Sequence, residues 1–434
     1  MHLHSQQPPA TVTTTKLARV LSLTVLAVIA VATVIGLVAL WPDHDRVAQL
    51  TAGPAAQNTS QAEVVNAEVL SITDGCEELF SFGDPASPEA AVSGSPQNPE
   101  ASLPDTPRPE IPRPESCKTA SVGLLDGPRA GHVENAEMRD TFAVSGIRVG
   151  DTVQVVGQEI TVPGDSATSP KTTTFYSVAG VSRGVPLAIL ALVFVAVLLW
   201  IGKVRGFLSL IALGISLVVV FGWMLPGLIS GGPGIAIGLV GSVAIMLVTL
   251  YFVHGFNHRT TSALIGTLAG IAIISVVSWI SISATRLSGV SDGHTASLAV
   301  MTHEIDFRGM LTAAVLIAGL GILNDVTISQ ASSVWELRAA APQMSRNDVY
   351  LSAMRIGRDH IASTVYTVFF AYVGAAVSTL ILLYLMDRPL LTVLSTEDIA
   401  LEIVRTLVGS IGLILAVPIT TWIASRFIAP GTEE

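Results

Sequence analysis

One apolar segment of this chain runs directly into polar residues, with no Gly or Pro stop between them. Residues 310–323, MLTAAVLIAGLGIL, form a run of 14. As a helix this run is about 21 Å long, whereas the hydrocarbon core of a membrane is about 30 Å thick. A helix that crosses a membrane here must take in the polar residues that follow it. The candidate binding residues are Asn324, Asp325, Ser329, Ser332 and Glu336.

Asp325 is the residue of this group with the most telling position. It would lie about 22 Å along the helix, still inside the hydrocarbon core. A carboxylate at that depth costs a few kcal/mol, so it should face protein or water. Our hypothesis is that Asp325 accepts a proton or cation, that Asn324 and the serines are hydrogen-bonding ligands, and that Glu336 is an inner gate. The alternative is a polar helix end that bonds its neighbours and holds no ligand.

The spacing of the polar residues gathers four of them on one helical face. They follow one another at steps of four, three and four, which is the repeat of a helix: Asp325, Ser329, Ser332 and Glu336. Small residues continue this face toward the start of the segment: Ala314, Ala318 and Gly321. The opposite side is apolar, with Leu316, Leu323, Val326 and Val334. We expect the small and polar face to lie against other helices or beside a water-filled cavity.

Charged residues at the start of the next apolar segment are candidate counter-charges. In AMRIGRDHIAST, Arg355 and Asp359 are spaced by four, and Arg358 and His360 lie beside them. Arg355 or Arg358 could pair with Asp325 or Glu336. The alternative is that these arginines mark the cytoplasmic boundary, where Lys and Arg gather.

Metal and enzyme chemistry have little support in the sequence. His254 and His258 in HGFNH have a spacing that could bind a metal, but no third ligand is evident, so we favour an interfacial turn. Other residues with metal-compatible side chains lack a recognisable spacing: His294, His303, Glu304 and Asp306. HExxH, GxSxG and P-loop motifs are missing from the sequence. We therefore expect no metal, no cofactor and no enzymatic activity.

The elements that must position the polar residues are membrane helices. Half of the 434 residues are hydrophobic and only 13% are charged, which is typical of an integral membrane protein. Runs of about 20 apolar residues indicate spanning helices. We place them at 18–40, 185–201, 206–225, 234–253, 262–284, 309–330, 361–386 and 404–425. The first is expected to be an uncleaved anchor after a cytoplasmic segment 1–17, because no small-x-small cleavage site follows it.

Positive charge sets the expected orientation. With a cytoplasmic N-terminus, the inner loops carry the basic residues Lys203, Arg205, Arg259, Arg338, Arg346, Arg355, Arg358 and Arg426. The outer loops are acidic, with Asp292, Glu304, Asp306, Asp387, Glu397, Asp398 and Glu402. This distribution predicts eight helices with both termini inside. In the last helix, Ser395-Thr396-Glu397-Asp398 resembles a capping box, and Glu402 and Arg405 are placed to pair.

Residues 43–183 are predicted to form an extracytoplasmic domain. They contain 20 of the 33 acidic residues but only 9 of the 23 basic ones, which argues against nucleic acid as a partner. Alternating stretches predict strands of a small β-rich barrel or sandwich, similar to an oligonucleotide/oligosaccharide-binding barrel. They are EVVNAEVLSIT, TASVGLL, MRDTFAV, IRVGDTVQVV and TTTFYSV. Residues 83–115 are a Pro-rich acidic insert that should be disordered.

The two cysteines of the chain, Cys76 and Cys117, bracket this insert. In an oxidising compartment a disulfide between them would close its base and stabilise the domain by about 4 kcal/mol. The alternative is a pair of free thiols.

Six ordered blocks of the sequence carry a resemblance to a known family. The blocks are RGVPLAILALVF, GKVRGFLSLIALGISL, LYFVHGFNHRTTSALIGTLAG, GLGILNDVTISQASSVWEL, IGRDHIASTVYTVFFAYVGAA and EIVRTLVGSIGLILAVPITT. Together they resemble the YibE/F family of bacterial multi-pass membrane proteins, from about Phe175 to Phe427. The resemblance implies a multi-pass plasma-membrane protein whose seven-helix domain covers residues 185–427. It supplies no substrate and no functional residues.

Two functions are compatible with these observations. The first is a permease-like protein that passes an unknown small solute or ion across the bilayer through the polar site at Asp325. The second is a non-transporting scaffold, assembly or sensor protein whose outer β domain binds a protein partner.

Overall fold

The computed structural model describes residues 16–52, 63–75, 118–138, 142, 145–162, 171–291, 293–302, 304–386 and 389–430. Its strands are β1 (Glu63–Asp74), β2 (Lys118–Leu124), β3 (Val133–Met138), β4 (Thr152–Val162) and β5 (Lys171–Val181). The helices up to residue 284 are α1 (Lys16–Ala39), α2 (His44–Ala52), α4 (Gly184–Val219), η1 (Val220–Met224), α5 (Leu225–Ile229), α6 (Gly234–His254) and α7 (His258–Ala284). The remaining helices are α8 (Gly293–Met301), α9 (Phe307–Ala340), α10 (Arg346–Leu385), α11 (Leu390–Leu394) and α12 (Glu397–Phe427). The chain divides into a unit of residues 52–194 and a helical unit of residues 1–51 and 195–434.

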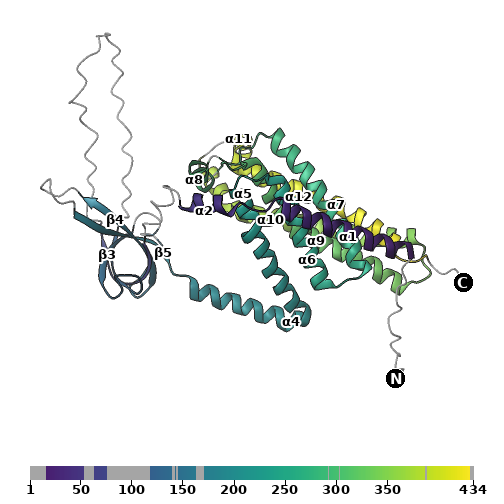
Figure 1. Ribbon diagram of the computed structural model, residues 1–434, viewed down its shortest axis with the longest axis horizontal. Helices are drawn as coiled ribbons and strands as arrows, with labels where there is room; N and C mark the ends of the chain where they lie inside the picture. The colour runs from purple at the N-terminus through teal and green to yellow at the C-terminus, as the bar shows by residue number, and fades with distance from the viewer. Residues whose placement is uncertain are drawn as a thin grey trace, which may run out of the picture. The chain divides into compact units, whose positions relative to one another are not determined.

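The smaller unit contains a closed barrel of five strands in the order β1-β2-β3-β5-β4 (Figure 1). All neighbouring strands are antiparallel except β3 and β5, which are parallel. Alternate residues of β1, Val65, Ala67 and Val69, point into the barrel and are almost fully buried. The apolar–polar alternation that predicted a β-rich barrel therefore corresponds to the inner and outer faces of the barrel. Five-stranded barrels of this size are the architecture used by oligonucleotide/oligosaccharide-binding domains.

The third strand begins before the stretch that was predicted for it. β3 is formed by VENAEM and shares Met138 with the predicted stretch MRDTFAV, of which only Met138 and Phe142 lie among the described residues. The buried residues of β3 are the three at its end, Ala136, Glu137 and Met138, whereas Val133 and Asn135 are exposed. A strand this short has too few alternations to be distinguished from its neighbours by pattern.

The two cysteines and the Pro-rich insert lie outside the described residues. The strands that border them are described: β1 and β2 pair to their ends, with Asp74 opposite Lys118. Gly75 also accepts a hydrogen bond from the Thr119 hydroxyl through its carbonyl, at 2.9 Å. The chain therefore leaves β1 and enters β2 at adjacent points of the sheet.

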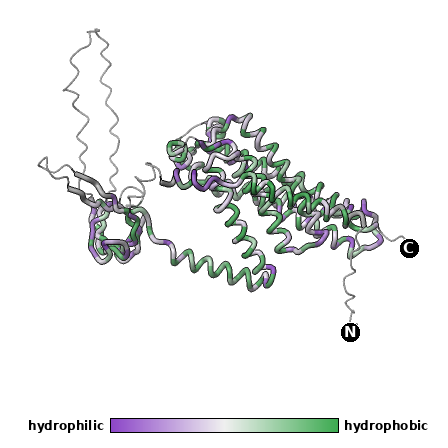
Figure 2. The backbone as a smooth tube through the Cα atoms, viewed as in Figure 1, coloured by the Kyte–Doolittle hydropathy of each residue, from purple (hydrophilic) through white to green (hydrophobic). Residues whose placement is uncertain are grey.

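The larger unit is a bundle of long apolar helices, as the predicted all-α membrane domain requires (Figure 2). In the described part of the chain, seven helices are long and apolar enough to cross a membrane. One of them, residues 184–229, is 46 residues long and is broken at Lys203, where φ is 48°. The chain folds back there and brings Gly206 against the Leu198 backbone. A Cβ on Gly206 would lie only 2.5 Å from the Leu198 carbonyl oxygen. This break corresponds to the predicted loop between spans 185–201 and 206–225, and the count of eight crossings stays a prediction.

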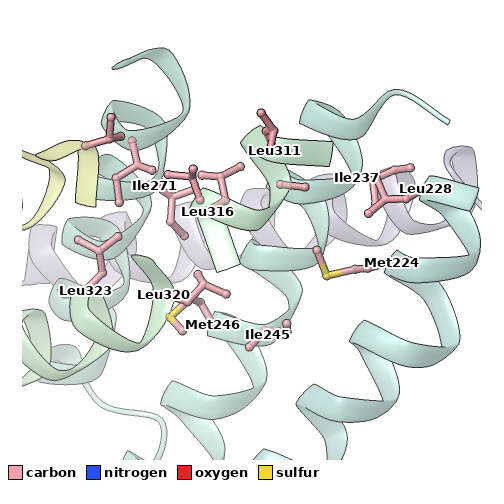
Figure 3. Packing of buried hydrophobic residues seen from close by; sticks show 14 of the residues in the cluster. Met224, Leu228, Ile237, Ile245, Met246, Ile271, Leu311, Leu316, Leu320 and Leu323 are labelled. Atoms are coloured by element: carbon pink, nitrogen blue, oxygen red, sulfur yellow. The ribbon is translucent and has the colours of Figure 1, made fainter. Parts of the chain in front are cut away.

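Four helices make the core of the bundle. In the most apolar 18-residue stretch of each helix, 50% to 56% of the residues are buried for α6, α7, α9 and α12, compared with 11% for α1 and 6% for α10. Figure 3 shows side chains of this core from several helices, among them Met246, Ile271, Leu316 and Leu323. Small residues let the helices approach: a Cβ on Gly234 would lie 2.7 Å from the Gly309 Cα, and one on Gly266 would lie 2.8 Å from the Thr420 Cβ.

Contacts along the helices show that their directions alternate. Gly234 and Gly238 of α6 meet Gly309 and Ala313 of α9 in the same order, so these two helices run parallel. Gly266 and Gly270 of α7 meet Thr420 and Ala416 of α12 in reverse order, so this pair is antiparallel. In Figure 1, α8 and α11 lie at one end of the bundle, whereas α1 begins and α12 ends at the other. This arrangement agrees with termini on one side of a membrane; which side remains a prediction.

The start of α12 is held by a loop rather than by its predicted capping box. The helix begins at Glu397, and Glu402 pairs with Arg405 at 2.8 Å, both as predicted. The Thr396 hydroxyl, however, donates to the Val393 carbonyl and makes no cap bond. The Glu397 carboxylate instead accepts hydrogen bonds from the backbone N–H groups of Ser288 and Gly289, at 2.6 and 2.9 Å. This contact links the end of α7 to the start of α12.

The same end of the bundle carries a second polar link. Arg46 of α2 forms an ion pair with Glu304, which precedes α9. The hydrogen bond from Arg46 to the Glu304 carboxylate raises the pKa of the guanidinium above its ordinary value. Both groups are about half exposed, so the pair adds little stability.

Candidate functional site

The candidate site is built on α9 and α10, two long helices with well-formed starts. The Asp306 carboxylate accepts a hydrogen bond from the Gly309 N–H at 2.9 Å and begins α9. The Ser345 hydroxyl accepts one from the Asp348 N–H at 3.1 Å and begins α10. Such side-chain caps satisfy amide groups that have no partner within the helix. The turn between the helices is held by Arg338, whose Nη1 donates to the carbonyl oxygens of Pro342 and Met344, each at 2.7 Å.

The predicted division of α9 into two sides is present. The apolar residues assigned to one side are all nearly fully buried in the bundle: Leu316, Leu323, Val326 and Val334. The small and polar face lies on the other side, where Gly321 and Asp325 are exposed. A Cβ on Gly321 would meet no atom within 4 Å. At these two residues the face is open, and whether it borders a water-filled cavity stays a prediction.

Asp325 faces a histidine of the neighbouring helix. Its Oδ2 lies 3.8 Å from Nε2 of His360 on α10, and the two side chains are 71% and 36% exposed, respectively. This separation is within ion-pair range but too long for a direct hydrogen bond. His360 Nε2 is enclosed and has no hydrogen-bond partner. The structure therefore brings a carboxylate and an imidazole from two helices to within ion-pair range, and the imidazole Nε2 has no hydrogen-bond partner.

The other predicted ligands lie unevenly around this pair. Asn324 is half-buried, and its Oδ1 is enclosed without a partner. The Ser332 hydroxyl is used within α9, since it donates to the Ile328 carbonyl at 2.7 Å. Ser329 is half-buried and Glu336 is exposed. Glu336 lies about 16 Å along the helix from Asp325, so the two carboxylates do not share one site.

The predicted arginine counter-charges do not serve that role here. Arg355 donates to the Ser352 hydroxyl at 3.0 Å on its own helix. Arg358 and Asp359 are exposed. Among the described residues, no ion pair joins Asp325 or Glu336 to either arginine. The helical position explains the result: His360 lies one residue beyond Asp359, on the side of α10 that faces α9.

Two polar contacts of α9 were missed from the sequence. Gln330 is 3% exposed, and its Nε2 donates to the Ala353 carbonyl of α10 at 2.8 Å. The hydroxyls of Thr327 and Thr267 on α7 lie 2.7 Å apart in the core. Gln330 and Thr327 belong to the same polar stretch as Asp325 but lie on a different face of the helix. That position is the signal that could have predicted hydrogen bonds from them to neighbouring helices.

The HGFNH segment is a tight turn between α6 and α7, as predicted. Gly255 has a φ of 76°, which favours glycine, and the Asn257 carboxamide accepts a hydrogen bond from the Thr260 N–H. In the part of the chain that the structure describes, no group of three or more His, Cys, Asp or Glu could hold a metal ion.

Comparison with known proteins places the helical unit in a family. A family model described as YibE/F-like protein matches residues 190–430, more than half of the chain. No curated protein matches the sequence, and no solved structure matches it.

Proposed function

This chain belongs to the YibE/F-like family, and from that premise we propose that it is a plasma-membrane permease that passes a small solute or ion along its α9–α10 face. Support begins with the helices. Seven of them, in the described residues, have the length and apolarity of membrane spans. Their charged side chains are few, which makes each charge within a span informative, because it costs free energy to hold there.

The observation that carries the proposal is the position of Asp325. It lies about 27 Å from the start of α9 and about 22 Å from its end, near the middle of a 34-residue helix. Its side chain is 71% exposed, on a face that no helix covers at Gly321. A carboxylate held at this depth is stable when water or a polar solute reaches it. A polar pathway along this face satisfies that requirement.

The test is flux through reconstituted protein. Wild type, Asp325→Asn and Asp325→Ala are placed in liposomes loaded with a panel of ions and small solutes. We expect wild type to release at least one of them faster than protein-free liposomes, and both variants to fall to the protein-free rate. The physical reason is that neither variant offers a charge at mid-span.

The matched control is Asp398→Asn, which removes an exposed carboxylate from the first turn of α12, outside the α9–α10 face. It should keep wild-type flux, because Asp398 belongs to neither α9 nor α10. Wild-type flux in both Asp325 variants would show that the site is wrong.

A second candidate function rests on the barrel. It has its own core, including Val69, Val122 and Val155, each fully buried, and it forms a separate compact unit. Such a module could bind a protein partner for a scaffold, assembly or sensor role. For that function, deletion of the barrel abolishes activity, whereas polar substitutions in α9 only weaken folding.

A further inference from the structure

We propose, resting on the permease function above, that the coupling species is a proton exchanged between the Asp325 carboxylate of α9 and the His360 imidazole of α10. The two groups lie 3.8 Å apart and come from different helices. His360 Nε2 and the adjacent Asn324 Oδ1 are both enclosed without hydrogen-bond partners. Catalytic and transport hydrogen bonds are often long in an unloaded protein and shorten when the site is loaded.

The step balances with these two groups alone. A proton from one aqueous side binds the Asp325 carboxylate, forming an O–H bond. That bond breaks as the proton moves to His360 Nε2, which forms an N–H bond and leaves the carboxylate anionic beside an imidazolium. Release of the Nε2 proton to the other side restores both groups, so one positive charge has crossed the site.

The ligands favour a proton over a metal cation. Hard cations such as Mg²⁺ and Ca²⁺ take six or more oxygen ligands. Here the contact joins one carboxylate, that of Asp325, to an imidazole nitrogen. Asp, Glu and His chains of this kind are typical of proton relays in membrane proteins.

Few other charges face the pair. On α9 the nearest is Glu336, about 16 Å away along the helix. On α10, Arg355, Arg358 and Asp359 are exposed and form no ion pair with Asp325 in the described structure. The charged residues of the other core helices lie toward their ends: Arg259 on α7, and Glu397, Asp398, Glu402, Arg405 and Arg426 on α12, with no Asp, Glu, Lys or Arg on α6. In the described residues, no third charged group forms an ion pair with Asp325 or His360.

Of the helices that pack against α9, the helix that carries His360 is the least buried. Only 6% of its most apolar stretch is buried. A hydrogen bond from the Gln330 side chain of α9 to the Ala353 carbonyl of α10 joins the two helices. Transfer of the proton from Asp325 to His360 creates an attraction between carboxylate and imidazolium, and release of the proton removes it, so the contact between α9 and α10 tightens and then loosens during the cycle. A proton on this site thus changes the helix contact that borders the open face.

The experiment measures proton entry into liposomes that contain pyranine, under an imposed pH gradient and a potassium–valinomycin potential. Wild type is compared with His360→Gln, His360→Arg and the neighbouring control Asp359→Asn. We expect His360→Gln to lower the proton flux about a hundredfold and to remove its pH dependence between about pH 5 and 8, where histidine titrates. His360→Arg keeps a positive partner for Asp325 but cannot release a proton, so it should lose flux equally. Asp359→Asn should keep the wild-type profile.

The outcomes separate this inference from the permease function. Solute flux that needs Asp325 but survives unchanged in His360→Gln overturns the proton exchange and leaves the permease standing. Uptake of radioactive sodium by wild type without proton movement also overturns it. The absence of any flux above protein-free liposomes, in wild type, overturns both proposals. If His360→Arg retains flux, His360 only positions Asp325, and the exchange is wrong.

Discussion

Replacing Gly234 by alanine is expected to destabilise the helical bundle by about 1–3 kcal/mol, the usual cost of overpacking. A Cβ at this position would lie 2.6 Å from the Gly309 carbonyl oxygen and 2.7 Å from its Cα. Both are backbone atoms, so no rotamer change can relieve the clash and α6 must move away from α9. The measurement is unfolding of the detergent-solubilised protein in increasing SDS, followed by tryptophan fluorescence.

Gly321→Ala on α9 is the matched control, because its Cβ would meet no atom within 4 Å. Alanine is favoured over glycine inside a helix by about 1 kcal/mol, so this variant should be as stable as wild type or slightly more so. Equal SDS midpoints for Gly234→Ala and Gly321→Ala would contradict the close crossing of α6 and α9.

Removing both cysteines is expected to lower the stability of the barrel by about 4 kcal/mol, if the predicted Cys76–Cys117 disulfide closes the long β1–β2 connection. The register that puts Asp74 opposite Lys118 brings the two ends of this connection together, so a short covalent bridge can close it. The bond itself is detected by peptide mass before and after reduction. Stability is then compared between wild type and Cys76→Ser/Cys117→Ser by limited proteolysis of the full chain at rising temperature.

Reduced wild type serves as the control and should behave as the double variant does. Alkylation of both thiols without prior reduction would contradict the disulfide.

Long apolar runs predicted the helices well, because hydrophobic length is a signal that each segment carries on its own. The ends were predicted less well: α10 begins at Arg346, whereas the predicted span begins at residue 361. Arg346, Asp348 and Arg355 are charged, so their helix is not apolar, and its start is fixed by Ser345, a cap that hydropathy does not detect. The third strand of the barrel starts earlier than the stretch predicted for it, at Val133, because its first residues do not alternate between apolar and polar.

The sequence predicted the polar face of α9 but not the residue of α10 that lies beside Asp325. Periodicity correctly put Asp325 and Leu323 on different sides of α9, because a helix's geometry is local. The choice of partner was not local: His360 and Arg358 are two residues apart, and the rotation of α10 against α9 decides which of them faces Asp325. That rotation is set by contacts such as Gly357 against Val417 of α12, a third helix. Charge alone therefore favoured the arginines, whereas packing selected the histidine.

The unequal burial of the helices bears on how the protein is assembled in the cell. Apart from Lys203 and Arg205 at its break, α4 is apolar, and none of its most apolar stretch is buried, so lipid alone is a good solvent for its apolar parts as they leave the translocon. α9 has the lowest hydropathy of the candidate spans and carries Asp325, which lipid alone accepts poorly. Its insertion benefits from partners that are already in place. Synthesis supplies them in order, because α6 and α7, which both pack against α9, precede it along the chain.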